Sequence, residues 1–145
     1  MRRFIFISIC LLLLGCAKVP DGVHKTYYGN GTLKAEVSYK DGKPDGPTKI
    51  YFESGNLDQE TNYVDGKENG LRRVYSKGRL WREEYCKDGK LNGPVKIYWE
   101  NGKVQLESQA VDDKLEGPGK FYLEDGTLQR EVVFQNGKPV VNKQQ

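Results

Sequence analysis

The sequence has few of the side chains on which most enzyme chemistry depends. Its 145 residues include one histidine, His24, and three cysteines. A catalytic triad or a zinc site needs histidine or cysteine at defined spacings, and the chain has neither arrangement. Carboxylates are abundant, but no spacing marks two of them as a buried catalytic pair. We therefore expect a protein that is not an enzyme and that carries no metal or other cofactor.

Clusters of one charge and helical periodicity are also missing. Lysines and glutamates alternate along the chain, whereas a nucleic-acid-binding protein normally has a basic patch, so nucleic acid is not an expected partner. No stretch after residue 16 keeps a helical period. Hydrophobic residues make up 37% of the chain, which permits only a thin core, but nine tyrosines argue against disorder. These features indicate one β-domain of ordinary size.

The first sixteen residues, MRRFIFISICLLLLGC, form a targeting signal. Arg2 and Arg3 give it a positive start. The apolar run from Phe4 to Leu14 is too short to cross a bilayer as a mature helix, but it has the length of a signal-peptide core. We predict a signal peptide over residues 1–15.

The last residues of this signal, LLGC, resemble a bacterial lipobox. The resemblance implies that the sulfur of Cys16 takes a diacylglycerol, that cleavage makes Cys16 the first residue, and that its amine takes a further acyl chain such as palmitate. Cys10 is not a competing site because the bulky Ile9 precedes it. Ala17, which is not an aspartate, favours the outer membrane by the same resemblance. The expected location is therefore the cell envelope, with residues 16–22 as a lipidated start and short linker. An ordinary cleaved signal with an incidental cysteine is the alternative.

Aligning the chain with itself reveals five copies of one unit. The step between copies is 24 residues, except for one step of 23. Four kinds of residue recur: a tyrosine, a turn glycine, an aliphatic residue two positions later and a glutamate five positions later. In the first copy they are Tyr27, Gly31, Leu33 and Glu36. A fixed period in this range indicates a repeat protein.

Each copy contains two turn signals. One is Asn-Gly or a related pair, such as Asn101-Gly102, and the other resembles DGKPDGP at residues 41–47. Asn-Gly suits a two-residue hairpin turn with positive φ at both positions. Stretches of about six to eight residues, rich in strand-forming types, lie between the turns. The sequence therefore predicts an all-β fold. It is a single-layer antiparallel meander of about five 24-residue hairpins, with about ten strands over residues 23–139 and a flexible tail at 140–145.

Two-residue turns would fix which residues face each other in each hairpin. The recurring glutamate then meets a lysine in four copies: Lys25 with Glu36, Lys49 with Glu60, Lys96 with Glu107, and Lys120 with Glu131. Such pairs contribute at most about 1 kcal/mol, and their larger role is to fix register. The third copy, YSKGRLWREE, has lost one residue before its turn glycine. A bulge or an altered turn is expected there, with Arg72 facing Glu83.

The predicted register separates an apolar face from a face of tyrosines, lysines and glutamates. The apolar face, on which the register also puts Leu57 opposite Phe52, carries the residues expected to contact a partner: Phe52, Trp99, Phe121 and Leu123. No segment of the mature chain is predicted to cover this face, and a large exposed apolar patch marks an interaction site. Cys86 falls on the apolar face, where packing is its expected role. Trp81 and Trp99 are able to stack on sugars, but packing is the expected role of each.

Units of the form DGKxxGPxxxYxENGxLxxE resemble the variant MORN repeat, which is common in bacterial proteins identified as YwqK-like antitoxins of toxin–antitoxin systems. The resemblance covers about residues 23–139 and implies extended antiparallel sheets that associate with proteins or membrane lipids and do not catalyse reactions. Two features depart from the pattern: Asp113 stands where a glycine is expected, and the third turn is short. A cytoplasmic antitoxin does not fit an exported chain, so an immunity protein acting in the envelope fits better.

Together these features predict a non-enzymatic, lipid-anchored protein of the bacterial envelope. It would bind an unidentified protein through one face of its sheet. If the chain is an antitoxin or an immunity protein, this partner would be a toxin. The structural alternative is contact with peptidoglycan or lipid head groups through the lysine and tyrosine face. A third possibility, an envelope enzyme, would need a deep polar cleft.

Overall fold

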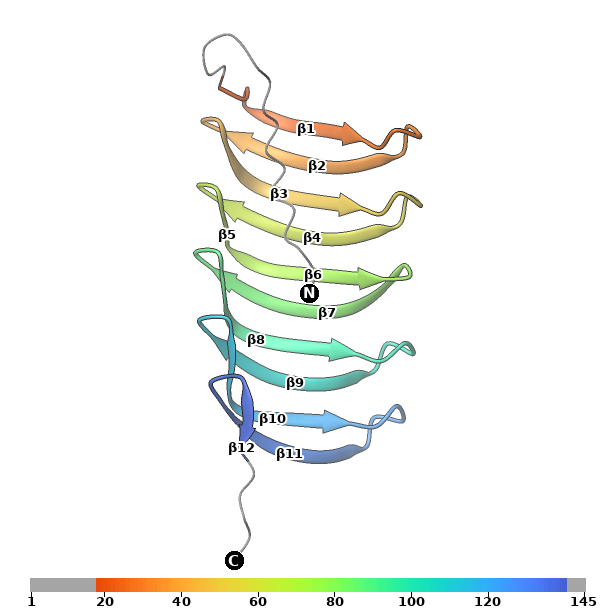
Figure 1. Ribbon diagram of the computed structural model, residues 1–145, viewed down its shortest axis with the longest axis vertical. Helices are drawn as coiled ribbons and strands as arrows, with labels where there is room; N and C mark the ends of the chain where they lie inside the picture. The colour runs from red at the N-terminus through yellow and green to blue at the C-terminus, as the bar shows by residue number, and fades with distance from the viewer. Residues whose placement is uncertain (1–17, 141–145) are drawn as a thin grey trace, which may run out of the picture.

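The computed structural model describes residues 18–140, which form one open antiparallel β-sheet without a second layer (Figure 1). Apart from one short strand, strands that follow one another in the chain lie side by side in the sheet, so the topology is a meander, and the predicted all-β fold class is confirmed. The predicted processing site at Cys16 and residues 141–145 of the predicted tail lie outside the described residues. In the described part of the chain, no helix has the length and apolar character needed to span a membrane.

The sheet contains twelve strands, two more than predicted, because the short β5 and β12 are separate strands. The strands are β1 (Gly22–Tyr27), β2 (Leu33–Lys40), β3 (Lys43–Tyr51), β4 (Leu57–Val64), β5 (Lys67–Glu68), β6 (Gly70–Ser76), β7 (Arg79–Lys87), β8 (Lys90–Tyr98), β9 (Val104–Val111), β10 (Lys114–Tyr122), β11 (Leu128–Gln135) and β12 (Lys138–Val140).

The turns that follow the second strand of each copy are two-residue hairpin turns. They are Asp41-Gly42, Asp65-Gly66, Asp88-Gly89, Asp112-Asp113 and Asn136-Gly137, and both residues of each pair have positive φ. This is the turn whose twist matches that of the flanking strands. Asp113, in the glycine position, has a φ of 69°, and its side chain accepts a hydrogen bond of 2.8 Å from the Leu91 backbone N–H. Aspartate is among the few residues that tolerate this conformation.

The turns inside four of the five copies are longer than predicted. In the second copy, the Phe52 carbonyl accepts from the Gly55 N–H at 2.9 Å, and the Phe52 N–H donates to the Asn56 carbonyl at 2.8 Å. This is a three-residue loop in which only the glycine has positive φ. The predicted two-residue turn is wrong here and in the first, fourth and fifth copies. Asparagine or aspartate serves another purpose, because its side-chain oxygen accepts from the backbone N–H two residues later in Asn30, Asn101 and Asp125.

A bulge on the return strand offsets the longer turn. In the second copy Tyr51 pairs with Leu57, and Asp58 is the extra residue of the bulge. The bulge shifts the pairing back by one position, so Lys49 lies opposite Glu60. Close to the turn the prediction is wrong, because Leu57 lies opposite Tyr51 and not opposite Phe52. Residues that face each other in a pair share one side of the sheet, so Leu57 lies on the side of the tyrosines.

The third copy has an altered turn, as its lost residue predicts. Lys77 and Gly78 form a two-residue loop with φ of 52° and 76°. A bulge at Trp81 then shifts the pairing by one position. As a result Glu83 faces Arg73, and the predicted pairing with Arg72 is wrong.

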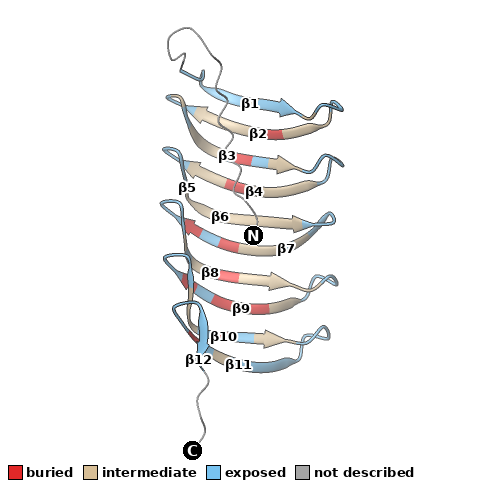
Figure 2. Cartoon of the chain, in the orientation of Figure 1, coloured by how far each residue is buried: buried red, intermediate tan, exposed pale blue. Residues whose placement is uncertain are grey.

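Burial is confined to one face of the sheet. Ten of the described side chains are buried, and strand alternation puts all of them opposite the tyrosines: Ala35, Thr48, Thr61, Glu84, Cys86, Val95, Leu106, Ser108, Ala110 and Phe134. We refer to this side as the apolar face and to the other as the tyrosine face. Figure 2 shows the buried positions mainly on the middle strands, whereas β1 and β12 are largely exposed. The core is therefore thin and partly polar.

Candidate binding surface

On the tyrosine face, a recurring trio of side chains bonds each repeat to the preceding one. A tyrosine hydroxyl donates to the glutamate of the preceding copy, at distances from 2.6 Å in Tyr98–Glu83 to 3.3 Å in Tyr51–Glu36. Arg73 pairs with Glu83 at 2.8 Å in the third copy. In each of the other copies a lysine pairs with the recurring glutamate. The N···O distances are 2.6 Å for Lys25–Glu36, 3.6 Å for Lys49–Glu60, 3.1 Å for Lys96–Glu107 and 3.7 Å for Lys120–Glu131.

These contacts fix the charge of the groups that make them. The hydrogen bond from Lys25 lowers the pKa of Glu36, and the one from Tyr98 lowers the pKa of Glu83. Burial, together with the hydrogen bond to Glu83, raises the pKa of Tyr98 to about 12. At neutral pH the carboxylates are therefore charged acceptors and the phenol is a neutral donor. The ladder joins the repeats and fixes their register.

The four residues predicted to contact a partner lie near the tips of the hairpins. Phe52, Trp99 and Leu123 occupy the same repeat position, directly after β3, β8 and β10, and Phe121 lies within β10. The third copy has Ser76 at this position, so the row of large side chains is interrupted between Phe52 and Trp99. Phe52 and Leu123 are 36% and 41% exposed, which makes them the most accessible of the four.

Trp99 and Phe121 have partners within the sheet. The indole N–H of Trp99 donates to the Tyr122 carbonyl at 3.0 Å. The ring of Phe121 packs against Phe134, with centroids 6.4 Å apart, and the guanidinium of Arg130 lies 4.5 Å from its centroid. Substituting either residue would therefore disturb the sheet as well as its surface.

The third copy places a charge network on the apolar face, where most residues at the equivalent positions of the other copies are uncharged. Glu84 is 2% exposed, and its carboxylate contacts the guanidinium groups of Arg72 and Arg82. Arg72 also pairs with Glu68. The residues equivalent to Glu84 in the other copies are Val37, Thr61, Ser108 and Val132. The shared residues of the repeat do not predict this network, although Glu84 differs from its equivalents when the copies are aligned position by position.

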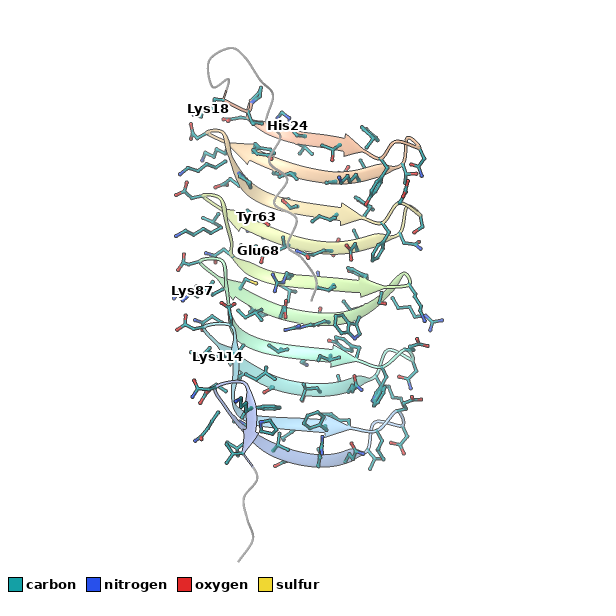
Figure 3. The ribbon with its side chains drawn as sticks, in the orientation of Figure 1. Lys18, His24, Tyr63, Glu68, Lys87 and Lys114 are labelled. Carbon is teal, nitrogen blue, oxygen red and sulfur yellow. The ribbon has the colours of Figure 1, made fainter. Side chains whose placement is uncertain are left out.

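Glu68 connects the network to Gln59, whose side-chain amide donates to it at 3.4 Å, and to two further side chains. Its carboxylate accepts from the Tyr63 hydroxyl at 3.4 Å and lies 3.6 Å from the Cys86 sulfur. Figure 3 shows Tyr63 and Glu68 at the side of the sheet where the turns between copies lie. Burial raises the pKa of the Cys86 thiol to about 12, so this thiol stays protonated and unreactive at neutral pH.

A groove of about 490 Å³ lies between the tips of the third and fourth hairpins. The groups that decide its chemistry come from both hairpins: Arg79, Leu80 and Trp81 from the third, and Trp99, Glu100 and Gln105 from the fourth. Within residues 18–140, no cluster of histidine, cysteine and carboxylate side chains has the arrangement of a metal site.

The groove exists because the third hairpin lacks a large side chain at its tip. In the first copy the residue after the tyrosine reaches the next repeat, since the Tyr28 hydroxyl donates to the Tyr51 carbonyl at 2.6 Å. Trp99 makes the equivalent bond in the fourth copy. The third copy has Ser76 there and a loop one residue shorter, and a serine is too short to span the junction. Arg79 spans the junction between the third and fourth hairpins at one end of the groove, where its guanidinium donates to the Glu100 backbone carbonyl at 3.2 Å.

Comparison with protein families explains the regular part of this architecture. Residues 20–41, 44–65, 91–112 and 115–136, more than half of the chain, match the MORN repeat variant. The chain belongs to the MORN repeat variant family. The four matching MORN segments leave out residues 66–90, which contain most of the third copy. The charge network and one wall of the groove therefore lie in the part of the sheet that the matching MORN segments leave out.

Other comparisons add little to the family assignment. No curated protein matches the sequence. Among solved structures, this MORN-repeat chain is similar to part of the protein in the crystal structure of TarM, with a TM-score of 0.46 and 11% identity. The similarity covers 68% of this chain and 20% of the TarM chain, so the chain spans about a fifth of that protein.

Proposed function

We propose that this MORN-repeat chain is a lipid-anchored binding protein of the bacterial cell envelope, which acts without catalysis and binds a protein partner on the apolar side of its sheet. The anchor is Cys16, supported by the lipobox-like residues LLGC at the end of an apolar signal. The outer membrane is the proposed location. Two or more acyl chains give a durable attachment, because each buried CH₂ contributes about 0.8 kcal/mol.

The observation that carries partner binding is the exposure of large apolar side chains on a single-layer sheet. Phe52 and Leu123 are 36% and 41% exposed at the hairpin tips, and in the described residues no second layer lies over them. With Trp99 they occupy one repeat position along the sheet, and a shared apolar surface of this kind, unlike a single exposed side chain, marks an association surface. The tyrosine face is less suited to this role, because its glutamates and tyrosines already bond to one another between repeats.

A narrower form of the proposal is a YwqK-like antitoxin or immunity protein. The partner would then be a toxin that enters or crosses the envelope. Genomic neighbourhood and co-expression test this form: a toxin encoded next to the chain should be neutralised by the wild-type protein.

Recovery of a partner from detergent-solubilised envelopes tests the binding surface. In a Phe52→Ser/Leu123→Ser double variant, we expect about tenfold less of the specific partner to be recovered with the tagged protein, because buried apolar anchors supply most interface energy. The matched control is Leu57→Ser/Leu128→Ser, which alters two leucines that pair across the strands with Tyr51 and Tyr122 and lie on the tyrosine face. This control should recover as much partner as the wild type. Equal recovery with both double variants would contradict the assignment of the surface.

A further inference from the structure

The groove between the third and fourth hairpins has the size of a small-molecule site and contains both of the chain's tryptophans. Its volume of about 490 Å³ lies within the range of about 300–1,000 Å³ that is usual for ligand pockets. Trp81 occupies the repeat position that Lys34, Asp58, Gln105 and Gln129 hold in the other copies. It is 40% exposed. A large aromatic side chain that borders a hollow without filling it presents a flat apolar surface to a ligand.

Planar polar groups border this aromatic surface. The Gln105 amide is able to donate and accept hydrogen bonds, the Glu100 carboxylate accepts them, and the Arg79 guanidinium donates them. Lys77 lies 3.5 Å from the Glu100 carboxylate at the rim. The lining therefore combines flat apolar area with closely spaced donors and acceptors.

A pyranose ring has the matching chemistry. One of its faces is a flat surface of C–H groups, and its edge carries hydroxyls that both donate and accept. An extended peptide matches less well, because it binds a sheet by pairing with a free strand edge. The strands beside the groove, β7 and β8, pair with neighbours on both sides.

We propose that this groove binds a pyranose residue of a glycan, with the ring against Trp81 and the hydroxyls directed to Gln105 and Glu100. The lost residue and the small Ser76 of the third copy open the space, and the bulge at Trp81 supplies the platform. The site is separate from Phe52 and Leu123, so glycan binding goes beyond the proposed partner binding and does not depend on it.

Tryptophan fluorescence reads this site directly, because the chain has only two tryptophans and both line the groove. The full-length lipoprotein, purified in a detergent without a sugar head group, is titrated with the trisaccharide of N-acetylglucosamine and with maltotriose. We expect a saturable change in emission with at least one sugar and a dissociation constant of about 1 mM, the usual scale for a small, weakly buried ligand.

Variants place the response in the groove. Trp81→Ala should weaken binding about tenfold or more, and Trp81→Phe, which keeps an aromatic face, should weaken it no more than about threefold. Gln105→Ala should weaken it about fivefold, and Gln129→Ala, the same change at the same repeat position of the fifth copy, should leave it unchanged. Thermal unfolding of each variant checks that the sheet is intact. Gln105→Ala and Gln129→Ala keep both tryptophans, so they still test the site if Trp81→Ala does not fold.

Three results would overturn the proposal. One is the absence of a saturable change with either sugar up to about 50 mM. Another is equal affinity in Gln105→Ala and Gln129→Ala, which would place the sugar elsewhere. The last is a response to a proline- and tyrosine-containing peptide without one to either sugar, which would assign the groove to a protein ligand. The Phe52→Ser/Leu123→Ser variant should bind sugar normally, so failure of the proposed partner binding and failure of glycan binding are distinguishable.

Discussion

Glu84→Ala is expected to lower the free energy of unfolding by about 3 kcal/mol, a large share of the about 5–15 kcal/mol that stabilises a typical domain. The carboxylate is 2% exposed and lies between the guanidinium groups of Arg72 and Arg82. Its removal leaves two cations on a largely buried face, where Glu68 balances only Arg72. Breaking a buried network costs more than the network contributes, because the remaining charges stay desolvated without a partner.

Urea unfolding followed by circular dichroism measures this effect. The control is Glu53→Ala, which alters an exposed glutamate in the hairpin turn of the second copy. It should change the free energy of unfolding by less than about 0.5 kcal/mol. A triple variant with the residues of the fourth copy, Arg72→Val, Arg82→Leu and Glu84→Ser, should regain most of the loss, because packed apolar residues commonly replace buried ion pairs without penalty. A Glu84→Ala protein as stable as the wild type would show that the network carries little energy.

Cys16→Ser is expected to abolish acylation of the protein in its native host completely. The thioether to diacylglycerol forms only on a cysteine sulfur, and the resemblance to a lipobox implies that cleavage before residue 16 follows this modification. The variant should therefore also keep residues 1–15. The wild-type chain, in contrast, should begin at Cys16 and carry two or more acyl chains, each with about 0.8 kcal/mol of membrane affinity per buried CH₂.

Intact-mass spectrometry of protein purified from envelopes decides this. The matched control is Cys86→Ser, which alters the buried thiol of β7 and should leave the lipid mass unchanged. A wild-type protein that carries no lipid, or a Cys16→Ser protein that still does, would contradict the proposed anchor.

The hairpin array could be predicted from the sequence because the same pattern of turn residues and strand-forming stretches occurs five times. A strand-length stretch between turn residues is weak evidence once, but a constant period leaves few alternatives to stacked hairpins. The Lys49–Glu60 register followed from counting residues across the turn. This pairing is correct although the predicted turn is not. The three-residue loop shifts the pairing by one position, and the bulge at Asp58 shifts it back.

The turn types could not be predicted because one dipeptide serves two purposes. Asn-Gly suits a two-residue turn, but in this sheet Asn101 bonds the Lys103 backbone N–H and only Gly102 has positive φ. The true two-residue turns lie between copies, at the Asp-Gly pairs and at Asp112-Asp113. Aligning the copies shows where turns occur but not how many residues each loop contains.

The altered turn of the third copy follows from its lost residue, but its charge network and its groove do not follow from the residues that the copies share. Glu84 and Trp81 stand at positions where the other copies have different residue types, and they form the charge network and the groove wall. Regular positions specify the sheet, whereas the departures of the third copy from the pattern produce the charge network and the groove.

Binding of a protein partner on the apolar side of the sheet is tested most directly by photo-cross-linking in living cells of the native host. A photoreactive amino acid is placed at position 52 or 123 at the hairpin tips, or at position 57 or 128 on the tyrosine face. Positions 52 and 123 should each yield the same cross-linked protein, and positions 57 and 128 should not. Cross-links from positions 57 and 128 alone, or from none of the four, would contradict binding through this side.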